Sequence, residues 1–159
     1  MHADGYWEAM EQEINTLVSM DAWEEVPFSN EYNVLDSIWA FKCKRYPDGR
    51  VKKLKARFCV RGDQQVEGVD FFETFAPVVQ WSTIRLLLVL SQCLGFATAQ
   101  VDYTAAFVQA TINEDVFVQM PKGFRKNGTI LKLRRSLYGL KQSPRNFSII
   151  LKKTFNLQH

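Results

Sequence analysis

One carboxylate, Asp102, follows the mostly apolar run of residues 96–101 and precedes Tyr103. The run predicts a strand that ends at Asp102 and presents its carboxylate at the carboxyl end. A carboxylate in that place could ligate a metal ion, because Mg²⁺ prefers oxygen ligands. It could equally open a turn or cap the next helical turn, since aspartate readily accepts hydrogen bonds from nearby backbone amides. These residues alone leave both interpretations open.

A second group that could do chemistry is a row of cations. The turn Asp48-Gly49 separates two strand-like segments, residues 38–46 and 50–61, which predicts a β-hairpin. The period of two gives the second strand one apolar face and one cationic face, the latter made of Lys53, Lys55, Arg57 and Arg61. Like charges on one face repel each other unless an anion lies across them, which indicates a phosphate-bearing ligand. A solubilising face or a lysine-protected edge strand is the alternative.

The charges are unevenly distributed along the chain. All 17 acidic residues lie at or before Asp115, together with ten of the 20 Lys and Arg residues. The segment after Asp115 carries the other ten cations and no acid. This asymmetry suggests a polyanionic partner for the tail, and a solvated basic face is the alternative.

Composition and residue positions exclude several classes of function. With 159 residues, 47% of them hydrophobic, the chain can bury a core and is expected to form one domain or part of one. Neither a membrane span nor a signal sequence is indicated, so we expect an intracellular protein. The only histidines, His2 and His159, stand at the two ends, where they are poorly placed to act as a general base. The three cysteines are widely spaced, which argues against a zinc site or a disulfide framework.

Several further elements must position these groups. Apolar residues recur at helical spacing from Trp7 to Val18, and another apolar helix is predicted from Ser82 or Thr83, as its cap, through Leu94. Gly95 suits the left-handed end of that helix. Further strands are predicted at residues 23–27, 116–120 and 130–133, and a last helix is predicted to begin with Ser143 as its cap. Strands joined by short turns, with a few helices, indicate an antiparallel α+β layer.

A succession of short motifs resembles the reverse transcriptase of Ty1/copia-type retrotransposons. The motifs occur in the family's order from about Tyr6 to Arg145. They are Trp7-Glu-Ala-Met10, Trp39-Ala-Phe-Lys42, Asp48-Gly49, Lys55-Ala-Arg57, Arg61-Gly62, Thr74-Phe-Ala-Pro-Val78, Gln100-Val-Asp-Tyr-Thr-Ala-Ala-Phe107, Met120-Pro-Lys-Gly-Phe124 and Leu137-Tyr-Gly-Leu-Lys-Gln-Ser-Pro-Arg145.

The resemblance implies an α+β fold with an antiparallel fingers hairpin and a partial palm sheet with packed helices. Residues 1–159 would form a single partial reverse transcriptase domain. Fingers and a connecting helix would occupy about residues 35–95, and part of the palm about residues 96–159.

The resemblance also implies roles for particular residues. Asp102 matches the first catalytic aspartate and would bind Mg²⁺ or Mn²⁺ together with the backbone carbonyl of Tyr103. Five residues are expected at the incoming nucleotide. Lys55 and Arg57 would contact its triphosphate, and Phe107 would exclude a ribose 2′-hydroxyl. Tyr138 and Gly139 would also lie beside the nucleotide. Residues expected at the nucleic acid are Lys53, Arg61, Lys141 and Gln142. Two-metal nucleotidyl transfer needs carboxylates that hold both ions about 4 Å apart.

One departure from the family limits this expectation. The other catalytic carboxylates of the family lie in a Tyr-x-Asp-Asp hairpin, whereas this chain has no Asp or Glu after Asp115. Glu114 and Asp115 are poor substitutes, since we expect them to be solvated at a turn. The usual Trp after the Pro-Arg pair is replaced by Asn146-Phe147.

The expected function is therefore a fragment of an RNA-directed DNA polymerase that is inactive alone. A catalytically dead nucleic-acid-binding remnant or a degenerate transposon product is the alternative. Expected partners are a template-primer of RNA or DNA, dNTP, and the integrase and ribonuclease H parts of a polyprotein, with no membrane. The expected location is a cytoplasmic virus-like particle or the nucleus.

Overall fold

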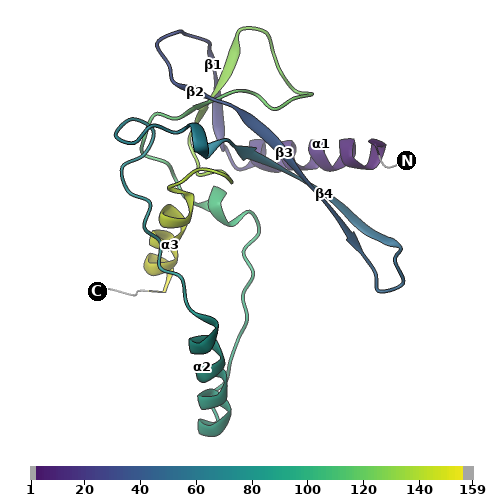
Figure 1. The fold of residues 1–159 in the computed structure, drawn as a ribbon, viewed down its shortest axis with the longest axis vertical. Helices are drawn as coiled ribbons and strands as arrows, with labels where there is room; N and C mark the ends of the chain where they lie inside the picture. The colour runs from purple at the N-terminus through teal and green to yellow at the C-terminus, as the bar shows by residue number, and fades with distance from the viewer. Residues whose placement is uncertain (1–2, 156–159) are drawn as a thin grey trace.

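The computed structural model describes residues 3–155, which form a mixed α+β fold (Figure 1). Its helices are α1 (Ala3–Ser19), α2 (Trp81–Leu94) and α3 (Ser143–Thr154), with short 3₁₀ turns η1 (Gly62–Gln64) and η2 (Ala106–Gln109). His2 and His159 lie outside the described residues.

The strands form two sheets. One contains β1 (Trp23–Pro27), β6 (Thr129–Leu133), β5 (Phe117–Val118) and β2 (Val34–Leu35), in that order. The other is the hairpin of β3 (Ser37–Arg45) and β4 (Val51–Val60). The strand pairs are antiparallel, as expected, except β2 with β5, which is parallel.

The core lies between the four-stranded sheet, the base of the hairpin and the segment before α3. Phe58, Leu131 and Leu137 are completely buried there. Helix α1 packs on the apolar face of β4, where Ala9 and Met10 contact Ala56. The predicted alternation on β4 is confirmed, because its even-numbered residues from Ala56 to Val60 are the buried ones.

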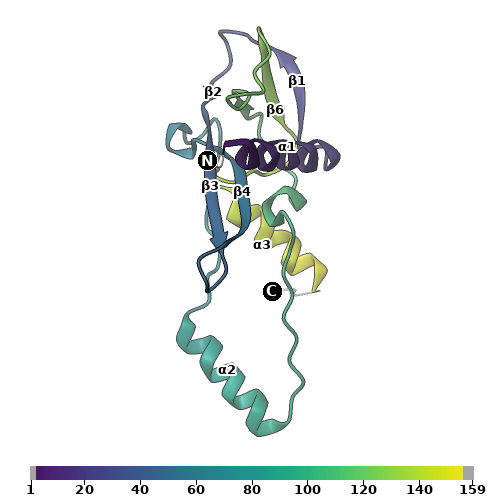
Figure 2. The same ribbon diagram turned by 90° about the vertical axis from the view of Figure 1, so that its right-hand side faces the viewer.

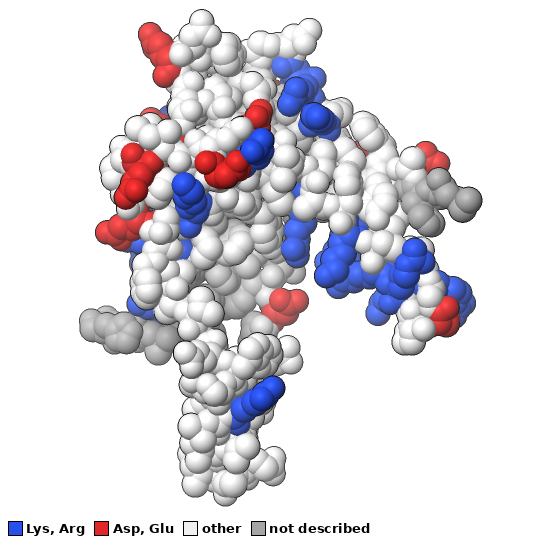
Figure 3. Space-filling view, viewed as in Figure 1, with Lys and Arg blue, Asp and Glu red and all other residues white. Residues whose placement is uncertain are grey.

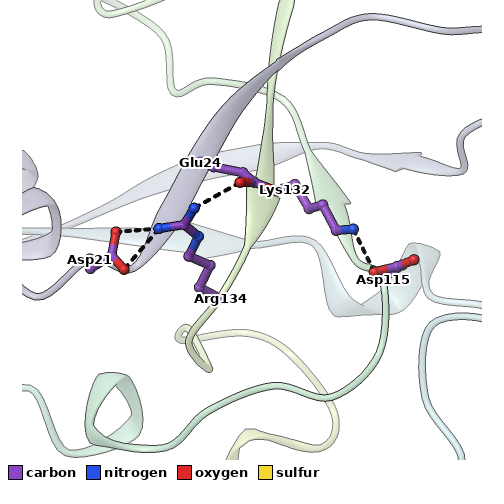
Figure 4. Close-up of polar contacts among 5 residues, drawn as sticks. All are labelled: Asp21, Glu24, Asp115, Lys132 and Arg134. Atoms are coloured by element: carbon purple, nitrogen blue, oxygen red, sulfur yellow. Dashed lines mark hydrogen bonds and ion pairs between the residues drawn. The ribbon is translucent and has the colours of Figure 1, made fainter.

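Ion pairs join the basic tail to the acidic first part of the chain. Arg134 donates to Asp21 at 2.9 Å and to Glu24 at 2.8 Å, and Lys132 pairs with Asp115 at 2.8 Å (Figure 4). Lys126 pairs with Glu25 and Arg145 with Glu73. Four tail cations are thus matched by carboxylates of the same chain, and the charge asymmetry does not by itself require a polyanionic partner for the tail.

Helix α2 stands apart from the rest of the molecule in both ribbon views, at the end of two long connecting segments (Figures 1 and 2). None of its residues is buried, and Leu87 and Leu88 remain more than half exposed. It begins at Trp81 with Gln80 as an N-cap that makes no side-chain bond, so the predicted cap at Ser82 or Thr83 is wrong. Gly95 ends it with φ 68°, as predicted. No helix of residues 3–155 is long and apolar enough to cross a membrane.

The strand predicted at residues 96–101 does not form. This segment leads back from α2 toward η2, and Phe96 and Val101 are about two-thirds exposed. An extended segment becomes a strand only when a neighbour accepts its backbone hydrogen bonds, and no described strand lies beside it. The strand predicted at residues 116–120 shortens to β5.

The predicted cap of the last helix is also wrong. Ser143 is the first residue of α3, and Gln142 occupies the N-cap position without a side-chain cap bond. The Ser143 hydroxyl is buried and donates instead to the carbonyl of Leu137 at 2.6 Å. It therefore holds the segment that precedes α3.

Candidate nucleotide and nucleic-acid site

A row of side chains joins the base of the hairpin to α3. The Arg57 guanidinium lies 4.7 Å from the centre of the Tyr138 ring, and that ring lies 4.9 Å from the Phe107 ring. Phe107 in turn lies 6.2 Å from Phe147, which is 5.4 Å from Tyr103. Three segments far apart in the sequence thus meet in one aromatic row, which we define as Arg57, Tyr138, Phe107, Phe147 and Tyr103.

Stacking leaves the Arg57 guanidinium chemically available. A guanidinium that lies over a ring is held by cation–π attraction, while its N–H groups point outward in the plane of the guanidinium and can still donate hydrogen bonds. Those donors match the geometry of a phosphate group. The structure therefore brings together Arg57, Tyr138 and Phe107, three of the residues expected at the nucleotide.

The cationic face of the hairpin is larger than one strand suggests. In the hairpin register, Lys42 lies opposite Lys55 and Lys44 lies opposite Lys53. Figure 3 shows Lys and Arg side chains gathered over the hairpin. We define the hairpin cation face as Lys42, Lys44, Lys53, Lys55 and Arg57.

Like charges directly opposite each other destabilise a strand pair. Among residues 3–155, none of the ion pairs within 4.0 Å involves a member of the hairpin cation face. A hollow of about 310 Å³ also opens between Lys42, Lys44, Lys55 and Arg57. This face is the strongest candidate for an anion-binding surface in the described part of the chain.

Glu13 approaches this region from α1. Burial raises the pKa of Glu13, and the backbone N–H of Phe58 together with the charges of Arg57 and Lys55 partly offsets that rise. Burial also raises the pKa of the Cys59 thiol, and the nearby Glu13 carboxylate adds to the effect. Glu13 and Cys59 therefore share one partly desolvated region beside the cation face.

Backbone contacts position Tyr138. The Val60 N–H donates to the Tyr138 carbonyl at 2.8 Å, and Cys59 forms an isolated parallel bridge with Tyr138. The next residue, Gly139, has φ 93°, and a Cβ there would lie 2.0 Å from the Val60 carbonyl oxygen. Only glycine allows so close an approach, so Gly139 fixes how the Tyr138 segment lies against β4.

Asp102 is exposed and lies in the unpaired segment before η2. Within residues 3–155, no group of three or more His, Cys, Asp or Glu side chains could hold a metal ion. Asp115, a poor substitute on sequence grounds, is paired with Lys132, and Glu114 is half-buried instead of solvated. The residues present therefore do not fit a two-metal site, and we derive no catalytic step through Mg²⁺ or Mn²⁺.

Three residues expected at the nucleic acid are engaged within the protein. Arg61 donates to Asp63 at 2.6 Å, a hydrogen bond that lowers the pKa of the Asp63 carboxyl below its ordinary value. The Lys141 ammonium lies 4.6 Å from the centre of the Phe71 ring. Gln142 is almost completely buried. Of the four residues expected there, only Lys53 belongs to the hairpin cation face.

Comparison with known proteins adds to this geometry. Residues 20–158 match the family model described as reverse transcriptase (RNA-dependent DNA polymerase). The chain belongs to this reverse transcriptase family. No solved structure matches it.

Two curated relatives are plant transposon polyproteins. The retrovirus-related Pol polyprotein from transposon TNT 1-94 of Nicotiana tabacum is 35% identical over 142 residues, which cover 87% of this chain and 11% of that protein. The one from transposon RE1 of Arabidopsis thaliana is 34% identical over 148 residues, which cover 91% of this chain and 10% of that protein. This reverse transcriptase segment therefore spans about a tenth of these relatives' length.

A shorter relative is also known. An uncharacterised mitochondrial protein of Arabidopsis thaliana is 40% identical over 90 residues, which cover 57% of this chain and 53% of that protein. The similarity to this chain thus also extends over about half of a protein much shorter than the polyproteins.

Sequence reasoning missed Lys42 and Lys44. Both alternate with apolar residues on the first hairpin strand, so pairing the two predicted strands across the Asp48-Gly49 turn would have placed them on the cationic face. Phe147 carried no comparable signal. Its contacts with Phe107 and Tyr103 depend on how α3 packs against η2, which no local pattern encodes.

Proposed function

We propose that this chain is the template- and nucleotide-binding portion of a retrotransposon RNA-directed DNA polymerase, and that it binds but does not polymerise on its own. Residues of about 35–95 would act as fingers and connecting helix, and residues of about 96–159 as part of the palm. Its partners would be an RNA or DNA template-primer, dNTP and the other parts of a Pol polyprotein. We propose the same cellular sites as for such a polyprotein, a cytoplasmic particle or the nucleus.

The observation that carries the proposal is the continuity between the hairpin cation face and the aromatic row. Arg57 belongs to both, so an anion held along the hairpin would end beside the rings of Tyr138 and Phe107. A nucleoside triphosphate has this layout, with phosphates at one end and a sugar and base at the other. A nucleic acid strand has the same chemistry repeated, and the lysines beyond Arg57 suit its backbone.

Binding without catalysis is favoured by the position of Asp102. Transfer of a nucleotidyl group needs metal ions fixed by several carboxylates, and the described residues offer no such group. A nucleic-acid-binding remnant is therefore the second candidate, and it uses the same surface.

The test is the salt dependence of binding to a single-stranded RNA 20-mer, measured by fluorescence anisotropy. Each phosphate contact releases condensed counterions and adds about 0.7 to the slope of log K against log salt. Replacing Lys42, Lys44, Lys53 and Lys55 with Gln should therefore lower that slope by up to about 3 units.

A matched variant removes four cations from the tail, namely Lys126, Lys132, Arg134 and Arg145, which are already paired with carboxylates. It has the same change in charge and should lower the slope by less than about 1 unit. Equal losses of slope in the two variants would show that net charge, and not the hairpin cation face, governs binding.

A further inference from the structure

Three buried polar residues have no role in the function proposed above. They are Gln65, Asp70 and Gln142, with exposed fractions of 6%, 1% and 1%. Buried polar side chains of this kind are costly unless each group finds a partner. We call this set the glutamine brace.

Both glutamine amides in the brace are satisfied within the protein. Gln65 Nε2 donates to Gln142 Oε1 at 2.9 Å, and Gln142 Nε2 donates to the Asp70 carbonyl at 2.7 Å. Gln65 Oε1 accepts from the Lys141 backbone N–H at 2.8 Å. Both Oε1 and Nε2 of Gln142 are thus hydrogen-bonded within the protein, which leaves Gln142 poorly placed to contact a ligand directly.

The Asp70 side chain anchors the other end of the brace. Its Oδ2 atom accepts from Asn33 Nδ2 at 2.6 Å and from the Val66 N–H at 2.7 Å. The loop that follows η1 is thereby closed on itself and tied to the residue before β2. The brace therefore rests on a fixed loop.

The brace joins that loop to residues 138–142. On one side, the Val60 N–H holds the Tyr138 carbonyl, and on the other, Gln65 holds Lys141 and Gln142. Tyr138 is itself held on the first side, and Lys141 and Gln142 are held on the second. The two attachments together hold the backbone from Tyr138 to Gln142, next to the contact of the Tyr138 ring with Arg57.

We propose that Gln65 and Gln142 are positioning residues that keep the Tyr138 ring beneath the Arg57 guanidinium. The inference rests on the proposed binding of triphosphate by Arg57. Without the brace, Tyr138 turns away, and Arg57 loses the stacking partner that directs its N–H groups toward the phosphates.

The test compares two neighbouring glutamines in the 159-residue chain. Gln65→Leu removes the bonds of the Gln65 amide to Gln142 and to the Lys141 N–H, and it keeps the bond from Gln142 to the Asp70 carbonyl. Gln64→Leu is the matched control, because Gln64 is the last residue of η1, directly before Gln65, and makes two bonds of its own, accepting from the Asp36 N–H at 2.7 Å and donating to Asp36 Oδ2 at 3.0 Å. Neither of those bonds reaches residues 138–142.

Two readouts apply to each variant. The first is the NMR shift of the Arg57 Nε–Hε pair, which a ring beneath it moves upfield, assigned by its loss in Arg57→Lys. The second is the dissociation constant of dATP in a metal-free buffer. Gln65→Leu should abolish the upfield shift and weaken dATP about tenfold, the size of a lost hydrogen bond to a charged group. Gln64→Leu should change neither.

The outcomes separate the two proposals. An unchanged Arg57 shift and dATP affinity in Gln65→Leu would overturn the positioning role, and loss of dATP binding in Gln142→Leu alone would then assign Gln142 a direct contact. If Arg57→Gln leaves dATP affinity unchanged, the proposed function fails, while the NMR shift still tests the brace. Should Gln65→Leu not fold, Gln65→Glu keeps the acceptor for Lys141, removes the donor to Gln142, and is held to the same two readouts.

Discussion

Replacing Gly139 with Ala tests how tightly the Tyr138 segment crosses β4. Gly139 has φ 93°, and the new Cβ would lie 2.0 Å from the Val60 carbonyl oxygen, an atom of the backbone that cannot rotate away. Gly128 is a matched control, because it has φ 70° and an added Cβ would meet nothing within 4 Å.

Both substitutions place an alanine in a left-handed backbone conformation, but only the one at Gly139 also brings a Cβ too close to Val60. A left-handed conformation costs an alanine about 1–2 kcal/mol at either position. Overpacking at Gly139 adds about 1–3 kcal/mol or more, since Val60 and the segment must separate. We therefore expect Gly139→Ala to destabilise the fold by about 2–5 kcal/mol and Gly128→Ala by about 1–2 kcal/mol.

Thermal unfolding followed by circular dichroism measures the difference. For a domain of this size, each kcal/mol lowers the Tm by about 2–4 °C, so the extra cost of about 1–3 kcal/mol should make Gly139→Ala unfold about 2–12 °C below Gly128→Ala. Equal shifts in Tm would refute the close approach of Gly139 to Val60. The aromatic row would then lack the support that we assign to it.

Three further predictions concern single positions or pairs of neighbouring residues. In a longer protein that polymerises, Phe107→Val should raise the use of rNTP relative to dNTP in single-turnover assays, and an unchanged preference would remove Phe107 as the residue that excludes the 2′-hydroxyl. Because burial raises the pKa of Glu13, the stability it contributes is complete below its ordinary value of 4.5 and is lost as pH rises through the higher folded-state pKa. Glu13→Gln should therefore flatten that fall in chemical denaturation curves, and a curve that falls as steeply as the parent's would contradict it. Replacing Leu87 and Leu88 on α2 with Glu should reduce the fluorescence of a bound apolar dye, since both side chains are more than half exposed; undiminished dye binding would place the apolar surface elsewhere.

Local patterns predicted the hairpin well. The Asp48-Gly49 turn and the alternation on β4 are both encoded by neighbouring residues, and the structure confirms them. Gly95 also ends α2 as predicted, because a left-handed helix end depends mainly on one local residue, usually glycine.

Patterns failed where the outcome depends on distant partners. Residues 96–101 have a strand-like composition but no described strand beside them, so they remain unpaired. Arg134 is one of the ten cations after Asp115, and Asp21 and Glu24 lie beside it because β1 pairs with β6. Charge counted along a sequence does not reveal such pairing.

The motifs also identified some residues of the candidate site correctly but did not reveal the contacts of others. The family motifs identified Arg57, Tyr138 and Phe107, and the structure brings these side chains into contact. The same motifs assigned Gln142 to the nucleic acid, whereas its amide is buried between Gln65 and Asp70. A motif shows which residue type occurs at a position, and only the packed structure shows whether the side chain faces a ligand or the protein interior.

Primer extension tests the central claim, that this chain binds nucleic acid through its hairpin but does not polymerise alone. A labelled primer on an RNA template is saturated with the purified chain, and the four dNTPs are added with Mg²⁺ or Mn²⁺. We predict that the primer is bound and not extended, because within residues 3–155 Asp102 is not joined by the further carboxylates that metal ions require. Extension that disappears in Asp102→Asn would contradict the account and would show that some other carboxylate of this chain completes the site.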